Sequence, residues 1–250
     1  RFREIFSMEE LKNWYQKLLD DYHKWISCSL SWKKERNASM KDLQFPFPYR
    51  EGQREIVSGV YHTVSSKKTL FVQAPTGVGK TMSAIFPSVR AIGEGKGETL
   101  FYLTAKTITG TVAWEAFHTL RENGLKFKVT AITAKEKLCF LDCTPEKCPY
   151  AKGHFDRVND AVYELWTTEE VYSREVIRAH AEKWQVCPFE MCLDLSVWVD
   201  GVICDYNYAF DPNVHLKRFF GENISGDYIF LIDEAHNLVE RGREMYSAEI

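Results

Sequence analysis

Positions 74–81 combine glycines, a lysine and a threonine in the order of a phosphate-binding loop. The segment contains, in order, Ala74, Pro75, Thr76, Gly77, Val78, Gly79, Lys80 and Thr81. The glycines allow backbone N–H groups to wrap round a phosphate, and the helix that follows presents its N-terminus to the anion. Lys80 would reach the β- and γ-phosphates of ATP, while the Thr81 hydroxyl would bind Mg²⁺. Ala74 replaces the first glycine of the general pattern, and an ordinary glycine turn is the alternative interpretation.

A second candidate site lies where an apolar run ends in two carboxylates. The run closes with Leu231 and Ile232, which are followed by Asp233, Glu234, Ala235 and His236. Asp233 would hold Mg²⁺ through its water shell, and Glu234 would polarise the attacking water as a general base. Four letters alone are a weak signal. The phosphate loop upstream makes an ATP-hydrolysing site the better interpretation.

Four of the seven cysteines have a spacing that suits a metal cluster. Cys139, Cys143, Cys148 and Cys187 are spaced C-x3-C-x4-C-x38-C, which lacks the C-x2-C pairs of most zinc sites. Four thiolates at this looser spacing can hold the corners of a 4Fe–4S cluster. Zinc in the same four thiolates is the alternative.

The remaining cysteines have simpler interpretations. Cys192 follows Cys187 closely and could replace one ligand, but a buried apolar thiol is favoured. Cys204 lies in an apolar run and Cys28 in a helical pattern, so both are expected in the core. An odd number of cysteines without a secretory signal argues against a disulfide framework and for reduced thiols in the cytoplasm.

The composition predicts a globular protein without bulk affinity for nucleic acid. Hydrophobic residues make up 45% of the chain, which is enough to build a core. The net charge is −3, so a nucleic-acid partner would need a local basic groove. No apolar run approaches the ~18 residues of a membrane span, and no membrane association is expected.

Short apolar runs alternate with helical patterns along most of the chain. We expect strands at 69–74, 99–105, 127–133, 201–205 and 228–233. We expect helices at 50–65, 81–92 and 112–123. This alternation predicts an α/β fold with a parallel sheet and helices on both faces.

Two segments depart from that rhythm. Ser7 and Glu10 form a capping box for a helix at 7–30, followed by a polar connector at 31–44. Its apolar stripe consists of Leu11, Trp14, Leu18, Tyr22 and Trp25, and we interpret it as a packing face, with a partner-binding face as the alternative. Residues 134–200 carry the clustered cysteines and helical stretches at 156–166 and 169–185, which predicts a small, mostly helical insertion.

The two ATP-site motifs together resemble motifs I and II of superfamily 2 helicases. Arg50 and Gln53 resemble the upstream motif that reads adenine, and residues 101–107 resemble motif Ia, which touches the DNA backbone. The run 204–208, C-D-Y-N-Y, and the position of the four cysteines between motifs Ia and II are similar to the XPD/DinG branch. The resemblance covers roughly residues 45–240.

This resemblance implies a P-loop, RecA-like motor lobe interrupted by an iron–sulfur insertion. The expected parts are a helical extension at 1–44, motor lobe one at 45–133 and 201–250, and the cluster insertion at 134–200. The expected cofactors are ATP, Mg²⁺ and a 4Fe–4S cluster held by the four spaced cysteines. His236 is expected to help couple ATP hydrolysis to movement on DNA. The expected DNA contacts are Thr104, Lys106, Lys135 and Lys137.

The activity implied is ATP-dependent unwinding of duplex DNA with 5′→3′ movement on a single strand. The second RecA-like lobe and the arch domain of such enzymes are not found in the sequence. Without the arginine finger of lobe two, which contributes ~10³–10⁵ in rate, we expect the chain alone to be almost inactive. A nucleotide-regulated, cluster-bearing DNA-binding or redox-sensing module is the alternative. An ordinary D-E-A-H RNA helicase would leave the four cysteines without a role.

Overall fold

The computed structural model describes residues 5–105 and 107–247, without the side chains of 107–109. Within these residues the strands form one parallel sheet in the order β3-β2-β4-β1-β5. The strands are β1 (Thr99–Thr104), β2 (Val129–Ala131), β3 (Val171–Tyr172), β4 (Gly201–Asp205) and β5 (Tyr228–Ile232). The expected α/β class is therefore confirmed.

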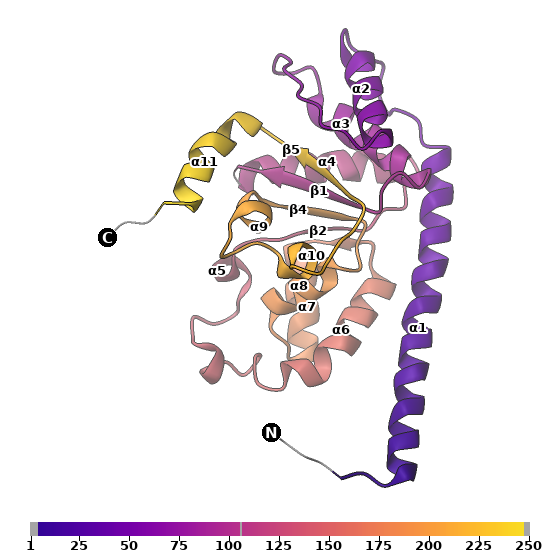
Figure 1. Cartoon of the computed structure of the whole chain (residues 1–250), viewed down its shortest axis with the longest axis vertical. Helices are drawn as coiled ribbons and strands as arrows, with labels where there is room; N and C mark the ends of the chain where they lie inside the picture. Colours follow the sequence, from indigo (N-terminus) through magenta and orange to yellow (C-terminus); the bar gives the residue numbers. More distant parts are fainter. Residues whose placement is uncertain (1–4, 106, 248–250) are drawn as a thin grey trace.

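Helices surround this sheet and connect its strands (Figure 1). Before β2 lie α1 (Met8–Lys41), α2 (Gln53–Ser65), α3 (Lys80–Gly93) and α4 (Thr107–Glu122). After β2 come α5 (Lys135–Leu138), α6 (His154–Thr168), α7 (Arg174–Trp184) and α8 (Pro188–Ser196). The last are α9 (Asn207–Phe210), α10 (Lys217–Phe220) and α11 (Leu238–Met245). None of the helices in the described part of the chain combines the length and the apolar composition that a membrane crossing requires.

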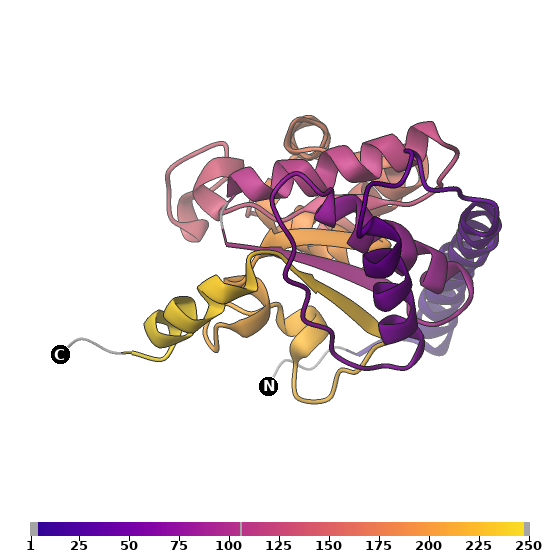
Figure 2. The same ribbon diagram turned by 90° about the horizontal axis from the view of Figure 1, so that it is seen from above.

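Side chains alternate along each strand, so the two faces of the sheet pack against different helices. Leu100 and Tyr102 of β1 pack with α3 and α4, whereas Phe101 and Leu103 pack with α6, α8 and α10. Figure 2 shows α4 on one side of the strands and α10 on the other. The prediction of helices on both faces is confirmed.

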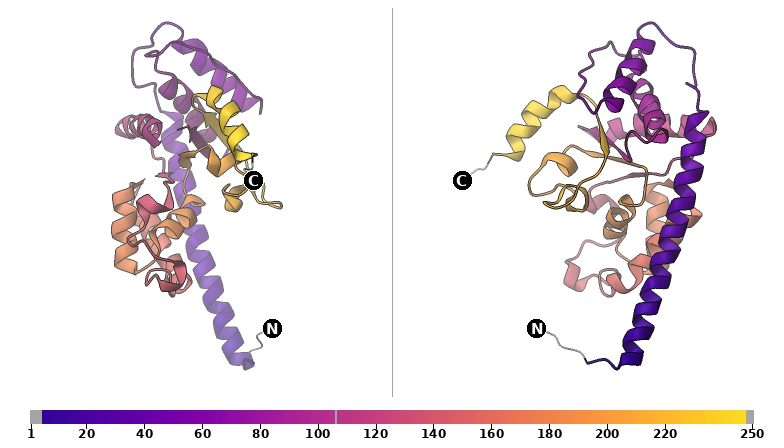
Figure 3. Two further views of the ribbon diagram at one scale, coloured as in Figure 1. Left: turned by 90° about the vertical axis from the view of Figure 1, so that its left-hand side faces the viewer. Right: turned by 45° about the vertical axis from the view of Figure 1, so that its right-hand side comes forward.

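The first helix is longer than expected and only partly packed. It continues to Lys41, so the polar connector at 31–44 was wrong. Trp25 packs on Tyr163 and Trp198, with ring centroids 5.0 and 4.1 Å apart. The four earlier residues of the apolar stripe stay exposed, Trp14 by 60%. Because the first half of α1 projects beyond the rest of the molecule (Figure 3), the described residues provide nothing for that half to pack against.

The expected strand at 69–74 does not form. The segment joins α2 to the phosphate loop without pairing with any described strand. Phe71 is 87% exposed, and Leu70 and Val72 are also largely exposed. An apolar run indicates burial, but a strand exists only where a neighbour accepts its hydrogen bonds. In the described residues β5 pairs with β1 alone and forms the edge of the sheet.

The sheet extends into the segment that contains the clustered cysteines. Instead of one helix at 169–185, the chain forms β3 and then α7, whose first turn is capped by Ser173 through the Val176 N–H. β3 pairs in parallel with β2. Residues 134–200 thus contribute a strand to the main sheet, and the domain boundaries at 134 and 200 stay predictions.

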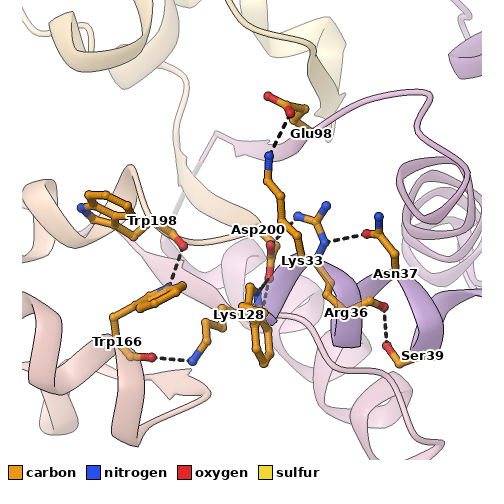
Figure 4. A network of polar contacts seen from close by, with 10 residues as sticks. Lys33, Arg36, Asn37, Ser39, Glu98, Lys128, Trp166, Trp198 and Asp200 are labelled. Atoms are coloured by element: carbon orange, nitrogen blue, oxygen red, sulfur yellow. Dashed lines mark hydrogen bonds and ion pairs between the residues drawn. The ribbon is translucent and has the colours of Figure 1, made fainter. Parts of the chain in front are cut away.

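A buried carboxylate joins α1 to the sheet. Asp200 lies directly before β4 and accepts hydrogen bonds from three groups. The Arg36 guanidinium lies 2.6 Å from one carboxylate oxygen (Figure 4), and the pair is almost fully buried. The Trp32 indole N–H and the backbone N–H of Lys128 bind the other oxygen, each at 2.9 Å.

The side chain of Lys128 extends from this contact with Asp200 towards α6. Its ammonium donates to the carbonyl oxygens of Trp166 and Glu169, both at 2.6 Å, and lies 4.4 Å from the centroid of the Trp32 ring. Burial lowers the pKa of Lys128 to about 8. One set of polar contacts therefore connects α1, β2, α6 and β4.

Replacing Asp200 should destabilise the fold strongly. In Asp200→Ala the buried Arg36 guanidinium loses its counter-ion, and removing one partner of such a pair costs about 3–5 kcal/mol. We expect urea unfolding to show this loss in the free energy of unfolding. The matched control is Glu98→Gln, which breaks an exposed ion pair with Lys33 and should change the free energy by less than ~1 kcal/mol. Equal effects of the two substitutions would contradict the importance of the buried pair.

Candidate functional site

The phosphate loop is shaped by two left-handed glycines and the start of α3. Gly77 and Gly79 have φ of 83° and 82°, a region that favours glycine. A Cβ on Gly79 would lie 2.6 Å from the Gln53 side-chain nitrogen. α3 begins at Lys80, directly after Gly79, so its free N–H groups face the loop. The local sequence therefore forms a tight turn at the start of a helix, and phosphate binding by this turn stays a prediction.

Residues at the start of α2 hold this loop from outside. The nearly buried Gln53 donates to the carbonyl oxygen of Val78 at 2.6 Å and accepts from the Arg50 N–H at 2.8 Å. The Arg50 guanidinium donates to the carbonyl oxygen of Gly77. Both residues thus contact the loop backbone, and their role in reading adenine stays a prediction. Beside Arg50 lies an open hollow of about 630 Å³ that is also lined by Phe47 and Tyr49.

The ammonium of Lys80 turns back over its own loop and donates to the carbonyl oxygen of Ala74 at 3.0 Å. Thr76, the remaining predicted contact of the loop, lies exposed on it.

The two expected halves of the ATP site meet through Tyr102 of β1. Its hydroxyl lies 3.5 Å from the Thr81 hydroxyl, and interaction with the same phenol acts to lower the pKa of the Asp233 carboxyl. Burial, followed by the charge of Glu234, raises the pKa of Asp233, while Tyr102 and Lys80 oppose this effect. Lys80, Thr81 and Asp233 therefore form one neighbourhood, although Lys80 and Asp233 are far apart in the sequence.

The acid pair lies directly after β5 in an unusual backbone conformation. The Asp233 N–H continues the sheet by donating to the Leu103 carbonyl oxygen at 2.9 Å. Glu234 has φ 49° and ψ 46°, which is left-handed and uncommon for a residue with a side chain. Tyr206 donates to the carbonyl oxygens of both acidic residues, at 3.1 Å to Glu234. His236 is exposed, with its ring nitrogen 3.4 Å from the Glu234 carboxylate.

Sequence reasoning missed Tyr102 and Tyr206 as members of the site. Both lie in runs that carry the family resemblance, 101–107 and 204–208, but neither was assigned to the ATP site. The available signal was positional, because the carboxyl ends of adjacent parallel strands meet at one edge of a sheet.

The four spaced cysteines gather in one region of loops. Desolvation, and then interaction with Cys148, raise the pKa of Cys143. Burial, and then the charges of Cys187 and Cys148, raise the pKa of Cys139. Within residues 5–105 and 107–247, however, no three metal-binding side chains are arranged to hold an ion. The loops thus bring the thiols near one another without forming a coordination geometry.

Neighbouring helices fix the backbone on either side of these cysteines. Arg178 of α7 donates to the carbonyl oxygens of Leu138 and Cys139, at 2.6 and 2.9 Å. The buried His154 ring at the start of α6 accepts from the Cys187 N–H at 3.2 Å. In contrast, Cys192 and Cys204 are fully enclosed, and burial raises the pKa of Cys192 to about 11.

The expected DNA contacts that the structure describes do not all lie on the molecular surface. Lys135 and Lys137 are exposed on α5 beside the cysteines. The Thr104 side chain at the end of β1 is only 3% exposed. Lys106 lies outside the described residues. The DNA contacts of all four stay predictions.

Comparison with known proteins shows which family the chain resembles. The DEAD_2 family model matches residues 122–250, which is just over half of the chain. The Regulator of telomere elongation helicase 1 homolog of Caenorhabditis briggsae is 22% identical over 260 residues, covering 85% of this chain and 26% of that protein. The Fanconi anemia group J protein homolog of Gallus gallus is 32% identical over 88 residues, or 35% of this chain and 6% of that protein.

A solved structure named XPD_Helicase has 18% identity and a TM-score of 0.49, covering 77% of this chain and 34% of that chain. The chain thus spans about a quarter or less of the lengths of these two curated relatives. The family match covers the acid pair, all four spaced cysteines and the strands between them. The chain therefore belongs to the DEAD_2 family, as a superfamily 2 helicase sequence of the XPD/DinG type.

Proposed function

We propose that this chain is the ATP-binding motor lobe of an ATP-dependent DNA helicase. The observation that carries the proposal is the meeting of the phosphate loop and the acid pair at Tyr102. A phosphate cradle next to a pair of carboxylates is what hydrolysis of a nucleoside triphosphate requires. Movement on single-stranded DNA, its 5′→3′ direction, and a second RecA-like lobe and arch domain in the parent protein belong to the same proposal.

Each residue of the site would have a separate task. The loop amides and Lys80 bind the phosphates, and the Thr81 hydroxyl and Asp233 carboxylate hold Mg²⁺. These oxygen donors fit the metal, because Mg²⁺ prefers hard oxygen ligands. When bound, Mg²⁺ neutralises charge on the phosphates. Glu234 accepts a proton from the attacking water. Its neighbour His236 helps to couple ATP hydrolysis to movement on DNA.

The nucleotide base would lie beside Arg50. The hollow there is lined by the rings of Phe47 and Tyr49, which offer apolar surface to a flat base. Since Arg50 and Gln53 also bind the loop carbonyls, contacts with the base would be transmitted directly to the phosphate loop.

The chain should bind Mg·ADP weakly, with a dissociation constant of roughly tens to hundreds of micromolar, because one face of the nucleotide stays open to solvent. Lys80→Ala should abolish this binding in isothermal titration calorimetry, since it removes the cation for the phosphates. Glu234→Gln is the control and should bind as wild type, because its side chain acts on water. Equal affinities of wild type and Lys80→Ala would refute the assignment of the loop.

The gathered cysteines favour a 4Fe–4S cluster as a further cofactor. The support is the electrostatic interaction of Cys139 with Cys148 and Cys187 and of Cys143 with Cys148, together with the backbone contacts that fix the loops. The thiols of Cys192 and Cys204 are enclosed elsewhere. This separation favours Cys139, Cys143, Cys148 and Cys187 as the four ligands, without Cys192.

Protein purified without oxygen should be brown and contain about four irons per chain, with broad absorption near ~400 nm. Cys139→Ser and Cys187→Ser should lose iron, sulfide and colour, because each removes one ligand. Cys204→Ser is the matched control and should retain the cluster. Metal analysis that finds one zinc per chain and no iron would decide for the alternative metal.

Single-stranded DNA would run past the exposed lysines of α5. Lys135 and Lys137 provide charge for phosphates, and the Phe140 and Tyr150 rings, 4.6 Å apart, lie nearby. Cations next to flat rings suit a single strand without strong sequence preference. Thr104 would take part only if its side chain became exposed.

Changing Lys106, Lys135 and Lys137 together to alanine should weaken binding of a fluorescent single-stranded oligonucleotide. The slope of log affinity against log salt should fall by roughly 0.7 for each lost phosphate contact. The charge-matched control changes three exposed lysines of α1, namely Lys12, Lys17 and Lys34. The same affinity and slope for both variants and wild type would place the DNA path elsewhere.

A further inference from the structure

The backbone of the acid pair is held by a residue from another strand. Tyr206, the residue after β4, is completely buried. Its single hydroxyl donates to the carbonyl oxygens of Asp233 and Glu234. The Glu234 oxygen also accepts from the N–H of Asn237 at 2.9 Å and from its side-chain amide at 3.1 Å. Three donors thus converge on the carbonyl oxygen of Glu234, the residue with the left-handed backbone.

This convergence explains how Glu234 keeps a conformation that its own sequence disfavours. Residues with a Cβ avoid positive φ, and such strain persists only where surrounding contacts determine it. In a regular strand, neighbouring side chains would point to opposite faces. The left-handed turn at Glu234 ends that alternation, so the direction of its carboxylate depends on the contacts that hold the peptide.

A second tyrosine acts on the side chain of the same pair. Tyr102 is buried in β1, between β4 and β5 in the sheet, its hydroxyl lies 3.5 Å from the Thr81 hydroxyl, and it also interacts with the Asp233 carboxyl, whose pKa it acts to lower. Thr81 belongs to α3 and Asp233 follows β5. The phenol therefore sets the spacing of two oxygen donors that come from separate elements.

We propose that Tyr102 and Tyr206 are positioning residues for the acid pair, Tyr102 through the Asp233 carboxylate and Tyr206 through the Asp233 and Glu234 peptides. The proposal rests on the proposed nucleotide site. Neither tyrosine contacts the reacting atoms: Tyr102 fixes the distance between the two metal-binding oxygens, and Tyr206 fixes the direction of the general base. The two tasks are separable, because one concerns a side chain and the other the backbone.

Phenylalanine substitutions remove only the hydroxyls and keep the buried rings. In Tyr102→Phe we expect the gain in ADP affinity on adding Mg²⁺ to shrink by roughly five- to tenfold, the value of one hydrogen bond. Affinity measured in EDTA should match wild type. The readout is isothermal titration calorimetry of the whole chain with ADP, with and without Mg²⁺.

In Tyr206→Phe we expect unchanged Mg·ADP affinity, because the loop and the metal-binding oxygens stay in place. Amide hydrogen exchange over residues 233–238 should instead become roughly five- to tenfold faster. The increase should be confined to that segment, whereas a general loss of packing would also accelerate exchange in β4 and β5. Tyr208→Phe is the matched control: it removes a nearby phenol that contacts Thr133 and not the acid pair.

The outcomes separate the inference from the proposed function. Wild-type protein that fails to bind Mg·ADP would overturn the proposed site, while the exchange test of Tyr206 would still decide its hold on the peptide. Wild-type binding, with unchanged Mg²⁺ dependence in Tyr102→Phe and unchanged exchange in Tyr206→Phe, would overturn the positioning roles alone. Should Tyr206→Phe fail to fold, the Mg²⁺ dependence of Tyr102→Phe still decides whether the acid pair is positioned from the neighbouring strands.

Discussion

The buried carboxylate of Asp200 is the constraint on which the arrangement of the layers depends. It binds Arg36 and Trp32 of α1 and the Lys128 backbone beside β2, and the chain enters β4 directly after it. An unpaired carboxylate at this depth would be costly, and so would an unpaired guanidinium. Each group therefore requires the other, which fixes where α1 attaches beside the starts of β2 and β4.

Parallel pairing of the strands then decides where the residues of the proposed site lie. β4, β1 and β5 are neighbours and all run in the same direction, so their carboxyl ends meet at one edge. Tyr206, Tyr102 and Asp233 each lie at or near such an end, and α3 delivers the phosphate loop to the same place. Residues separated by more than a hundred positions become neighbours because the strands alternate with helices.

The cysteine-bearing segment is anchored to this sheet. β3 adds a strand next to β2, and the helices α6, α7 and α8 share a core with Phe101 and Leu103 of β1. Arg178 and His154 extend that anchorage to the loops around Cys139 and Cys187. One packed layer therefore joins the cysteine-bearing segment to β1, the strand that carries Tyr102.

The sequence by itself determined the motifs and the elements next to them. The spacing of Gly77, Gly79 and Lys80 fixes a local turn, and the β4 and β5 runs were placed almost to the residue, because such signals depend on near neighbours in the chain. Only the tertiary structure decided the rest. The run at 69–74 has strand composition but no pairing partner among the described strands. The second half of α1 packs on α3, on α6 and on the residues just before β4. Tyr102 and Tyr206 join the site through strand order. Pairing, burial and strand order depend on residues distant in sequence, which no local pattern encodes.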